Sequence, residues 1–144
     1  MEDALGADIV VVRGAAKVVG GNLLQLPLRV EPGRAIVGRA GVALYTTGAR
    51  KEVPGVRTFV SVDGGMGDNI RPAMYGARYE ALSAQRPLAP AEETVTIAGK
   101  YCESGDVLAR DLALPRLRAG EVLAMPAAGA YQLSMASNYN LAYR

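Results

Sequence analysis

The sequence predicts an all-β fold, either a barrel or a sandwich, and three observations lead to this prediction. Short runs of β-branched and aromatic residues recur along the 144 residues, and 17 glycines and 8 prolines separate them at regular intervals. A helical repeat of apolar residues is nearly absent, so the alternating helices of a parallel α/β domain are missing. The chain is long enough for one domain with a single hydrophobic core.

Three strands are expected in the N-terminal part of the chain. Asp8–Arg13 is β-branched and ends at a glycine, and Lys17–Val19 is a second short run, followed by a predicted turn at Gly20–Asn22. Residues Leu23–Val30 are apolar but contain Pro27, which indicates an edge strand or a bend rather than a helix.

The middle of the chain predicts a long strand, a hairpin and a sharp turn. Ala35–Thr47 contains internal glycines, which favour a curved strand with a bulge. Gly48–Gly55 is polar and rich in turn residues, so we expect the tip of a hairpin there. Thr58–Val62 alternates clearly between inward and outward residues and runs into a turn at Asp63–Gly65.

The last part of the chain predicts one helix and three strands. Pro72 suits the first turn of a short helix, which we expect to extend to Leu82. The remaining expected elements are a loop at Arg86–Pro90, strands at Glu93–Ala98, Val107–Leu114 and Glu121–Met125, and a polar, aromatic tail from Met135 to Arg144.

The composition excludes several classes of function. The formal net charge is +2, and the basic residues form no cluster of the kind that binds nucleic acid. Histidine is absent, which excludes Ser-His and Cys-His catalysis within this chain. A single cysteine excludes an internal disulfide and a cysteine-rich zinc site. The apolar runs are too short to span a membrane and no signal peptide is visible, so we expect a cytoplasmic protein without a membrane or metal site.

The segment Lys100–Asp106 contains the single cysteine, Cys102, directly followed by Glu103. A thiol beside a carboxylate, on a tight loop between apolar runs, indicates a proton donor next to a group that binds a cation. The alternative, which is more common for a lone cysteine, is a buried small apolar side chain.

Three further polar clusters lie in apolar surroundings. Glu31–Arg34 has the composition of an anion cradle, since glycine lets backbone N–H groups approach a phosphate and arginine offers a planar fork of donors; the alternative is a turn with a surface ion pair. Arg71 and Tyr75 lie four apart and would share a helix face that suits one carboxylate, although a solvated arginine beside a packed tyrosine fits equally well. Tyr131 follows Gly129 and is typical of an aromatic residue in the core or at its rim.

Four segments, VEPGR, VDGGMGDNIRPAMYGA, YCESGD and GAYQLSMASNYN, occur in this order between Leu28 and Asn140. Together they closely resemble the C-terminal region of diaminopimelate decarboxylases, the pyridoxal-phosphate lyases that make lysine. The resemblance implies a Greek-key β-barrel domain over residues 28–144, with one or two short helices. The segment Ala16–Pro27 resembles the strand before the family's TIM barrel, so residues 1–27 would add N-terminal strands to one folded domain.

The resemblance also implies a role for each cluster at the cofactor. Glu31 would face the pyridine nitrogen of pyridoxal phosphate and keep the ring protonated. Gly33, Arg34 and Tyr131 would hold the phosphate, and Arg34 and Tyr131 would also contact the substrate.

The remaining clusters would bind the substrate, and two of their residues imply a dimer. Arg71 and Tyr75 would bind the distal carboxylate end and Glu103 the distal ammonium group. Cys102 would return a proton to the carbon that loses carbon dioxide. Because Cys102 and Glu103 reach into the neighbouring subunit's site in the family, the resemblance implies a homodimer.

The chain departs from the family in lacking nearly all of the TIM barrel and its Schiff-base lysine. Its three lysines, Lys17, Lys51 and Lys100, do not lie in the family's context for that residue. We therefore expect this chain to be inactive alone and not to bind the cofactor covalently. The alternatives are half of an active enzyme that is completed by a separate barrel chain, and a structural, self-associating module.

Overall fold

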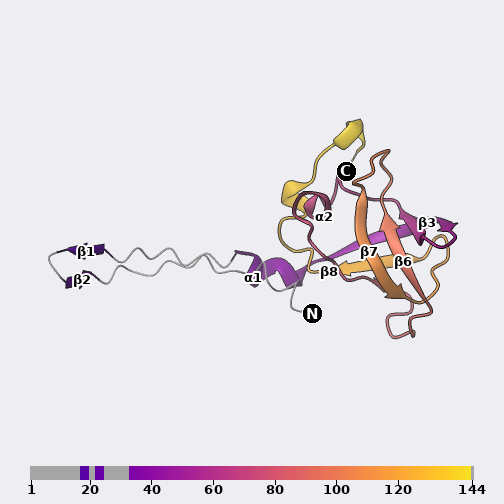
Figure 1. Ribbon diagram of the computed structural model, residues 1–144, viewed down its shortest axis with the longest axis horizontal. Helices are drawn as coiled ribbons and strands as arrows, with labels where there is room; N and C mark the ends of the chain where they lie inside the picture. The colour runs from indigo at the N-terminus through magenta and orange to yellow at the C-terminus, as the bar shows by residue number, and fades with distance from the viewer. Residues whose placement is uncertain (1–16, 20–21, 25–32, 144) are drawn as a thin grey trace.

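The computed structural model describes residues 17–19, 22–24 and 33–143, and a six-stranded sheet is its main element (Figure 1). The strand order is β5-β8-β3-β4-β6-β7. The strands are β3 (Val42–Val53), β4 (Arg57–Val62), β5 (Leu82–Ser83), β6 (Glu93–Ala98), β7 (Val107–Leu114) and β8 (Val122–Pro126). Two short helices, α1 (Gly33–Val37) and α2 (Arg71–Tyr75), accompany the sheet, as do three 3-10 turns, η1 (Gly38–Ala40), η2 (Leu133–Met135) and η3 (Tyr139–Leu141).

A separate two-stranded sheet consists of β1 (Lys17–Val19) and β2 (Asn22–Leu24). The expected strand at Lys17–Val19 is confirmed, whereas Asn22, which we assigned to the turn, belongs to β2. The expected strand at Asp8–Arg13, most of the segment 23–30 and the candidate residue Glu31 lie outside the described residues.

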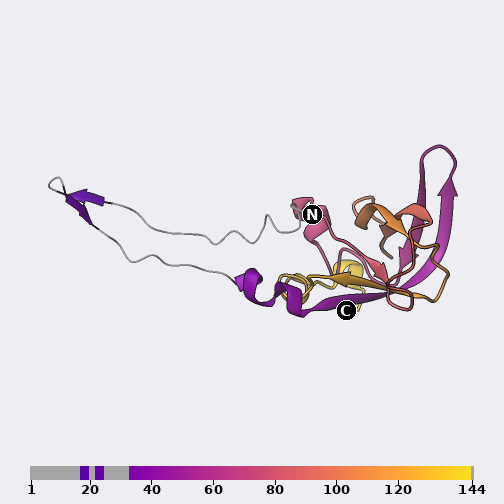
Figure 2. The ribbon, with the colours of Figure 1, turned by 90° about the horizontal axis from the view of Figure 1, so that it is seen from below.

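The long strand β3 makes the sheet curl. Its first half, Val42–Thr46, pairs with β8, and its second half pairs with β4 across a register shift between Thr47 and Arg50. A bulge of this kind bends a strand and increases its twist. Figure 2 shows the β3–β4 hairpin bending away from the rest of the sheet, and Figure 1 shows β6 and β7 crossing over β3 and β8.

The sheet is an open half-barrel, which corrects the predicted closed barrel and also the sandwich. Closure requires each strand to have two paired neighbours. The edge strand β5 has only two residues and pairs only with β8. It forms no hydrogen-bonded ladder with β7, the strand at the other edge, so the sheet does not close. The prediction of a mostly β domain with one or two short helices is confirmed.

One pair in the sheet is parallel: β4 runs beside β6, with Phe59 opposite Thr96. Parallel neighbours need a crossover connection. Here the connection is residues 63–92, which contain the turn after β4, helix α2 and strand β5.

The hydrophobic core is built around strand β6, which lies between β4 and β7. Val95, Thr96 and Ile97 of this strand are fully buried. The apolar side chains packed around them come from every other long strand and from the loops: Tyr45, Val60, Val62, Tyr79, Leu108, Ala109, Leu114, Leu117, Leu123 and Met125. Burial of these side chains is the main force that holds the sheet in its curl.

The segment 35–40 forms α1 and η1 rather than the start of a strand. Ile36 and Val37 are exposed and pair with nothing, because the chain must turn here to bring Gly41 against Gly129. A Cβ on Gly41 would lie 2.6 Å from the Cα of Gly129, and a Cβ on Gly129 would overlap the Val37 carbonyl oxygen. The backbone packing of two glycines therefore overrides the β propensity of the apolar residues around them.

Residues 127–131, which we call the Tyr131 turn, are fixed to this region by two backbone hydrogen bonds. Ala128 N–H donates to the Gly41 carbonyl and Gly129 N–H donates to the Gly38 carbonyl, both at 2.9 Å. The contact brings the Tyr131 turn next to α1.

Two further boundaries differ from the prediction. Strand β3 continues through the expected hairpin tip, because Lys51–Val53 pair with Arg57–Phe59. Helix α2 ends at Tyr75 instead of reaching Leu82, since Gly76 takes a left-handed conformation (φ 63°) that closes the helix. The predicted strands Glu93–Ala98 and Val107–Leu114 are confirmed residue for residue.

Within the described ranges, none of the helices has the length and apolar character needed to cross a membrane.

Candidate functional site

Arg71 is buried between two tyrosine rings. Arg71 is the first residue of helix α2, and it is only 9% exposed. The guanidinium carbon lies 5.9 Å from the centre of the Tyr75 ring and 5.8 Å from that of Tyr131. Arg71 Nε has no hydrogen-bond partner, and no acidic side chain in the described part of the chain forms an ion pair with Arg71.

This arrangement suits a carboxylate or phosphate ligand. A guanidinium presents parallel N–H donors that match both anions, and the cation–π contacts with the two rings hold it in place. A charge removed from water also attracts an anion more strongly than an exposed one does. The predicted pairing of Arg71 with Tyr75 on one short helix is confirmed, and the alternative of a solvated arginine is wrong.

Tyr131 joins Arg71 to the segment Gly33–Arg34. The Tyr131 hydroxyl lies 3.6 Å from the position that a Cβ on Gly33 would occupy. Arg34 is half-buried, and its Cγ lies 3.1 Å from the corresponding Cβ position on Gly38, so its stem folds across α1 and η1. The structure therefore brings Gly33, Arg34, Arg71, Tyr75 and Tyr131 into one group, although they come from three distant segments.

Cys102 and Glu103 lie in a second group, on the loop between β6 and β7. Cys102 is exposed, so the alternative of a buried small apolar residue is wrong. Glu103 accepts hydrogen bonds from the Gly105 N–H and the Ser104 hydroxyl, both at 3.2 Å, and from the Tyr139 hydroxyl at 3.4 Å. The Gly105 bond is the main cause that holds the pKa of Glu103 below its usual value. A carboxylate that stays ionised in this way suits a cationic ligand.

Asp106 fastens the second group to the first, and sequence reasoning did not select it. Its Oδ1 accepts the Met66 N–H at 2.6 Å and its Oδ2 accepts the Tyr101 N–H at 2.7 Å. It therefore ties the loop at residues 99–106 (the Cys102 loop) to the loop at residues 63–70 (the glycine loop), which runs into α2. Asp106 is 3% exposed, and burial raises its pKa although the two N–H donors act in the opposite direction.

Glycines in both loops make room for the Asp106 carboxylate. A Cβ on Gly65 would lie 2.6 Å from Asp106 Oδ1, and a Cβ on Gly99 would overlap the same carboxylate. A backbone hydrogen bond of 2.9 Å from Lys100 N–H to the Gly64 carbonyl adds a further link between the loops. Gly65 is thus explained by the buried Asp106 carboxylate, whereas Gly64 and Gly67 make room for the side chains of Tyr45 and Tyr101.

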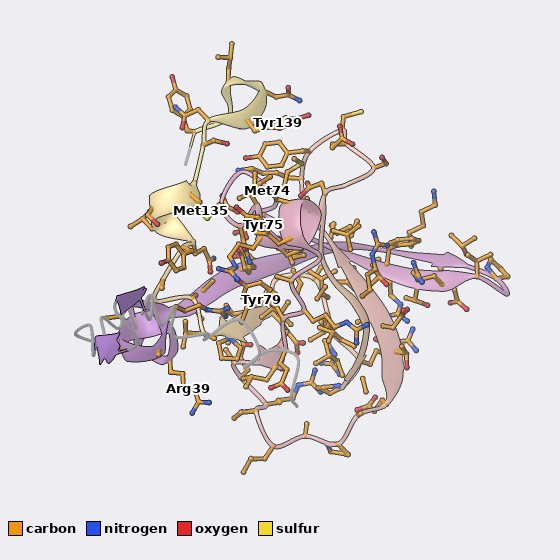
Figure 3. The ribbon with its side chains drawn as sticks, turned by 60° about the vertical axis from the view of Figure 1, so that its left-hand side comes forward. Arg39, Met74, Tyr75, Tyr79, Met135 and Tyr139 are labelled. Atoms are coloured by element: carbon orange, nitrogen blue, oxygen red, sulfur yellow. The ribbon has the colours of Figure 1, made fainter. Side chains whose placement is uncertain are left out.

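The C-terminal tail covers the junction of the two loops. Ser137 N–H donates to the Gly67 carbonyl at 2.8 Å. The rings of Tyr139 and Tyr101 meet edge to face, with their centres 5.3 Å apart. Figure 3 shows Tyr139 beside the Cys102 loop, above Met74 and Tyr75 of α2.

A buried polar pair, Gln132 and Tyr45, lies next to Tyr131 in the chain and was also missed by sequence reasoning. The Gln132 amide donates from Nε2 to the Tyr45 hydroxyl at 3.1 Å, and both residues are less than a tenth exposed. Burial, followed by the charges of Asp68 and other nearby acidic groups, raises the pKa of the Tyr45 hydroxyl well above its usual value.

Comparison with known proteins identifies the family to which the chain is similar. The family model described as the C-terminal sheet domain of pyridoxal-dependent decarboxylases matches residues 10–129. Diaminopimelate decarboxylase from Bacillus methanolicus is 53% identical over 131 residues, which cover 90% of this chain and 30% of that protein. Diaminopimelate decarboxylase from Bacillus subtilis (strain 168) is 59% identical over 111 residues, which cover 77% of this chain and 25% of that protein.

Solved structures give the same result. A crystal structure of diaminopimelate decarboxylase from M. jannaschii, in co-complex with L-lysine, has a TM-score of 0.73 and 44% identity over 79% of this chain and 26% of that one. A lysine/ornithine decarboxylase from Vibrio vulnificus, complexed with putrescine, has a TM-score of 0.67 and 26% identity over 79% of this chain and 30% of that one. The chain spans between a quarter and a third of the length of these relatives.

Replacing Asp106 by asparagine should destabilise the domain by about 1–3 kcal/mol, because an amide can accept only one of the two buried N–H bonds and turns a donor toward the other. Urea unfolding of the parent and of each variant measures the change in the free energy of unfolding. The matched control is Asp111→Asn, which removes an exposed ion pair with Arg57 and should cost about 0–1 kcal/mol. Equal effects of the two substitutions would contradict the role given to Asp106.

Stability should fall as the pH rises above about 10, the ordinary pKa of tyrosine. Tyr45 keeps its proton in the folded state and loses it on unfolding, so the folded state binds more protons in this range. Tyr45→Phe should flatten the fall of unfolding free energy between pH 9 and 11, leaving the smaller part due to Tyr101, whose pKa burial also raises. Tyr143→Phe, at a residue that is 91% exposed, should leave the slope as in the parent.

Proposed function

The chain belongs to the pyridoxal-dependent decarboxylases, as their C-terminal sheet domain, and from this premise we propose that it supplies one half of a diaminopimelate decarboxylase active site. Its strongest relatives carry that name and belong to lysine biosynthesis. The observation that carries the proposal is the buried guanidinium of Arg71, held between two tyrosine rings without an acidic partner in the described residues.

The group around Tyr131 fits the phosphate of the cofactor. Gly33 has no side chain, so a ligand can approach its backbone N–H beside the Tyr131 hydroxyl. Because Arg34 follows directly, the Gly33 N–H, the Tyr131 hydroxyl and the Arg34 guanidinium can all bind one phosphate. Pyridoxal phosphate, when bound, supplies the electron sink that makes loss of carbon dioxide feasible. Glu31, two residues before Gly33, is assigned to the ring nitrogen by the family resemblance.

Arg71, Tyr75 and Glu103 select the distal end of the substrate in this proposal. The Arg71 guanidinium would pair with the distal carboxylate, with the Tyr75 and Tyr131 rings excluding water from that ion pair. Glu103 would accept the distal ammonium group, for which its lowered pKa keeps it charged. Together these groups recognise an amino-acid head group at the end that does not react.

Cys102 is the proposed proton donor to the carbon that loses carbon dioxide. It is exposed, and the Asp106 hydrogen bonds fix the loop that carries it, which is what efficient proton transfer requires. Cys102 and Glu103 lie on the loop between β6 and β7, whereas Arg71 lies on α2. This division supports a homodimer in which Cys102 and Glu103 complete the partner subunit's site.

The 144-residue chain should not complete the reaction by itself. Lys51 pairs opposite Phe59 near the β3–β4 hairpin tip, and Lys100 lies over the Tyr101 ring, so neither is placed beside Gly33 or Tyr131. The family resemblance assigns the lysine that anchors the cofactor to a barrel, which we propose as the binding partner of the domain.

The outer face of the sheet supports such a partner. Leu44 and Leu82 are exposed, and both lie opposite Ala124 on β8, so an apolar row crosses three strands. Val42, on the same face of β3, extends the row. An exposed apolar row of this kind is typical of a surface that another chain or domain covers.

L-lysine should bind to the purified domain through Arg71. One test is an NMR titration that follows the Arg71 Nε–H signal in the parent and in the exposed control Arg110→Gln. Isothermal titration calorimetry measures the affinity in these two proteins and in Arg71→Gln, which lacks that signal. L-lysine should shift the signal, whereas 1,5-diaminopentane, which lacks the carboxylate, should not. Arg110→Gln should bind as the parent does and Arg71→Gln at least ~10-fold more weakly, as expected for loss of a charge-assisted pair. Equal binding of the two ligands would contradict the assignment of Arg71.

The same preparation, with added pyridoxal phosphate, should release no carbon dioxide from meso-diaminopimelate. Borohydride reduction followed by peptide mapping should likewise find no single lysine labelled stoichiometrically. Steady release of carbon dioxide, or one fully labelled lysine, would contradict the need for a barrel.

A further inference from the structure

We propose that the buried hydrogen bond between Gln132 and Tyr45 positions the Tyr131 ring against Arg71 and thereby sets the affinity of the site for a carboxylate ligand. Both residues are positioning residues, since neither reaches the group around Arg71 itself. The identity of the ligand rests on the proposed function, whereas the positioning of Tyr131 is a property of the chain alone.

Tyr131 needs an anchor because of its backbone conformation. Its φ is 58°, in the left-handed region, and Ala127 in the same turn has φ 60°. Non-glycine residues enter this region at a cost, and they stay there only where surrounding contacts impose it. The Tyr131 side chain is itself 48% exposed and cannot supply those contacts.

Gln132 is the residue that anchors this stretch. It is 8% exposed, whereas Tyr131 before it is 48% exposed and Leu133 after it is 82% exposed. A polar side chain thus points inward between two neighbours that point outward. The Tyr45 hydroxyl is its single hydrogen-bond partner within the described residues, because Oε1 of Gln132 has none.

Tyr45 connects this anchor to the loop that leads to Arg71. Its ring packs against Gly64 so closely that a Cβ there would overlap the ring. The neighbouring Thr46 N–H donates to Asp63 Oδ1 at 2.8 Å, which fixes the start of the same loop to β3. One buried tyrosine therefore contacts both segments that have to meet, the Tyr131 turn and the glycine loop.

The surroundings of Tyr45 keep the hydrogen bond in place. Burial raises the pKa of the Tyr45 hydroxyl, and the charges of Asp68, Tyr79 and Asp63 raise it further, whereas the Gln132 hydrogen bond acts in the opposite direction. The hydroxyl therefore stays neutral, and Gln132 remains its partner through the working pH range.

The discriminating variant is the double substitution Tyr45→Phe/Gln132→Leu. Replacement of both members of a buried hydrogen bond by apolar groups of similar shape can leave stability nearly unchanged. It nevertheless removes the side-chain hydrogen bond that ties Gln132, directly after the Tyr131 turn, to β3. A merely structural pair would therefore be replaced without effect on the site, and a positioning pair would not.

Two measurements on the folded domain test the proposal. The first is the ring-current shift of the Arg71 Nε–H signal without ligand, with Tyr131→Leu giving the shift expected when the ring is gone. The second is the dissociation constant for L-lysine. We expect the double variant to unfold at nearly the parent urea concentration, to move the Arg71 signal toward its Tyr131→Leu position and to bind L-lysine about 5-fold more weakly, as expected for loss of a cation–π contact.

The exposed control Leu133→Gln should match the parent in both measurements. A folded double variant with the parent Arg71 signal and the parent affinity would overturn the proposal. If the double variant fails to fold, Tyr45→Phe alone retains the ring that packs on Gly64 and is judged by the same criteria. If the parent binds no L-lysine, the proposed function fails, and the Arg71 signal still decides whether Gln132 and Tyr45 position Tyr131.

Discussion

The carboxylate of Asp106 is the constraint on which the candidate site depends. It is buried, and it accepts backbone N–H groups from the two loops that follow the paired strands β4 and β6. One of these loops carries Cys102 and Glu103, and the other leads directly into α2 and Arg71. A Cβ on either of the glycines that face the carboxylate, Gly65 and Gly99, would clash with it, so both loops need glycine at these positions.

The sheet and the loops that connect its strands have different roles in the domain. The curled sheet supplies a rigid core, and the polar groups stand on the connections above it, where side chains can meet a ligand. The sheet determines where the connections begin, and the buried polar contacts of Asp106, Tyr45 and Gln132 determine how they lie against one another. Asp106 and Tyr45 therefore contribute both to the stability of the domain and to the shape of its candidate site.

Sequence reasoning succeeded where the signal is local. The strand Glu93–Ala98 alternates in sequence, Val107–Leu114 is an apolar run that ends at Pro115, and the spacing of Arg71 and Tyr75 needs only one turn of helix. It failed where contacts join distant segments. The helix over 33–37 results from the approach of Gly41 to Gly129, and the open sheet results from an edge strand of two residues.

The buried polar contacts could not be predicted for the same reason. Asp106 and Met66 are 40 residues apart, and Gln132 and Tyr45 are 87 apart, so neither pairing has a local pattern. The roles of Cys102, Glu103 and Tyr131 came from the order of four motifs and not from spacing. Such an order identifies a family, but it does not reveal which buried groups hold its site in shape.

The parallel pairing of β4 with β6 has a consequence for how the site forms. The hairpins β3–β4 and β6–β7 join neighbours in sequence and can close early, whereas β4 and β6 must wait until the whole connection over residues 63–92 is in place. Arg71, Tyr75 and the glycine loop all lie in that connection. The groups proposed to bind the ligand are thus placed by a non-local pairing, so we expect a domain in which only the two hairpins have formed to lack the arrangement of these groups.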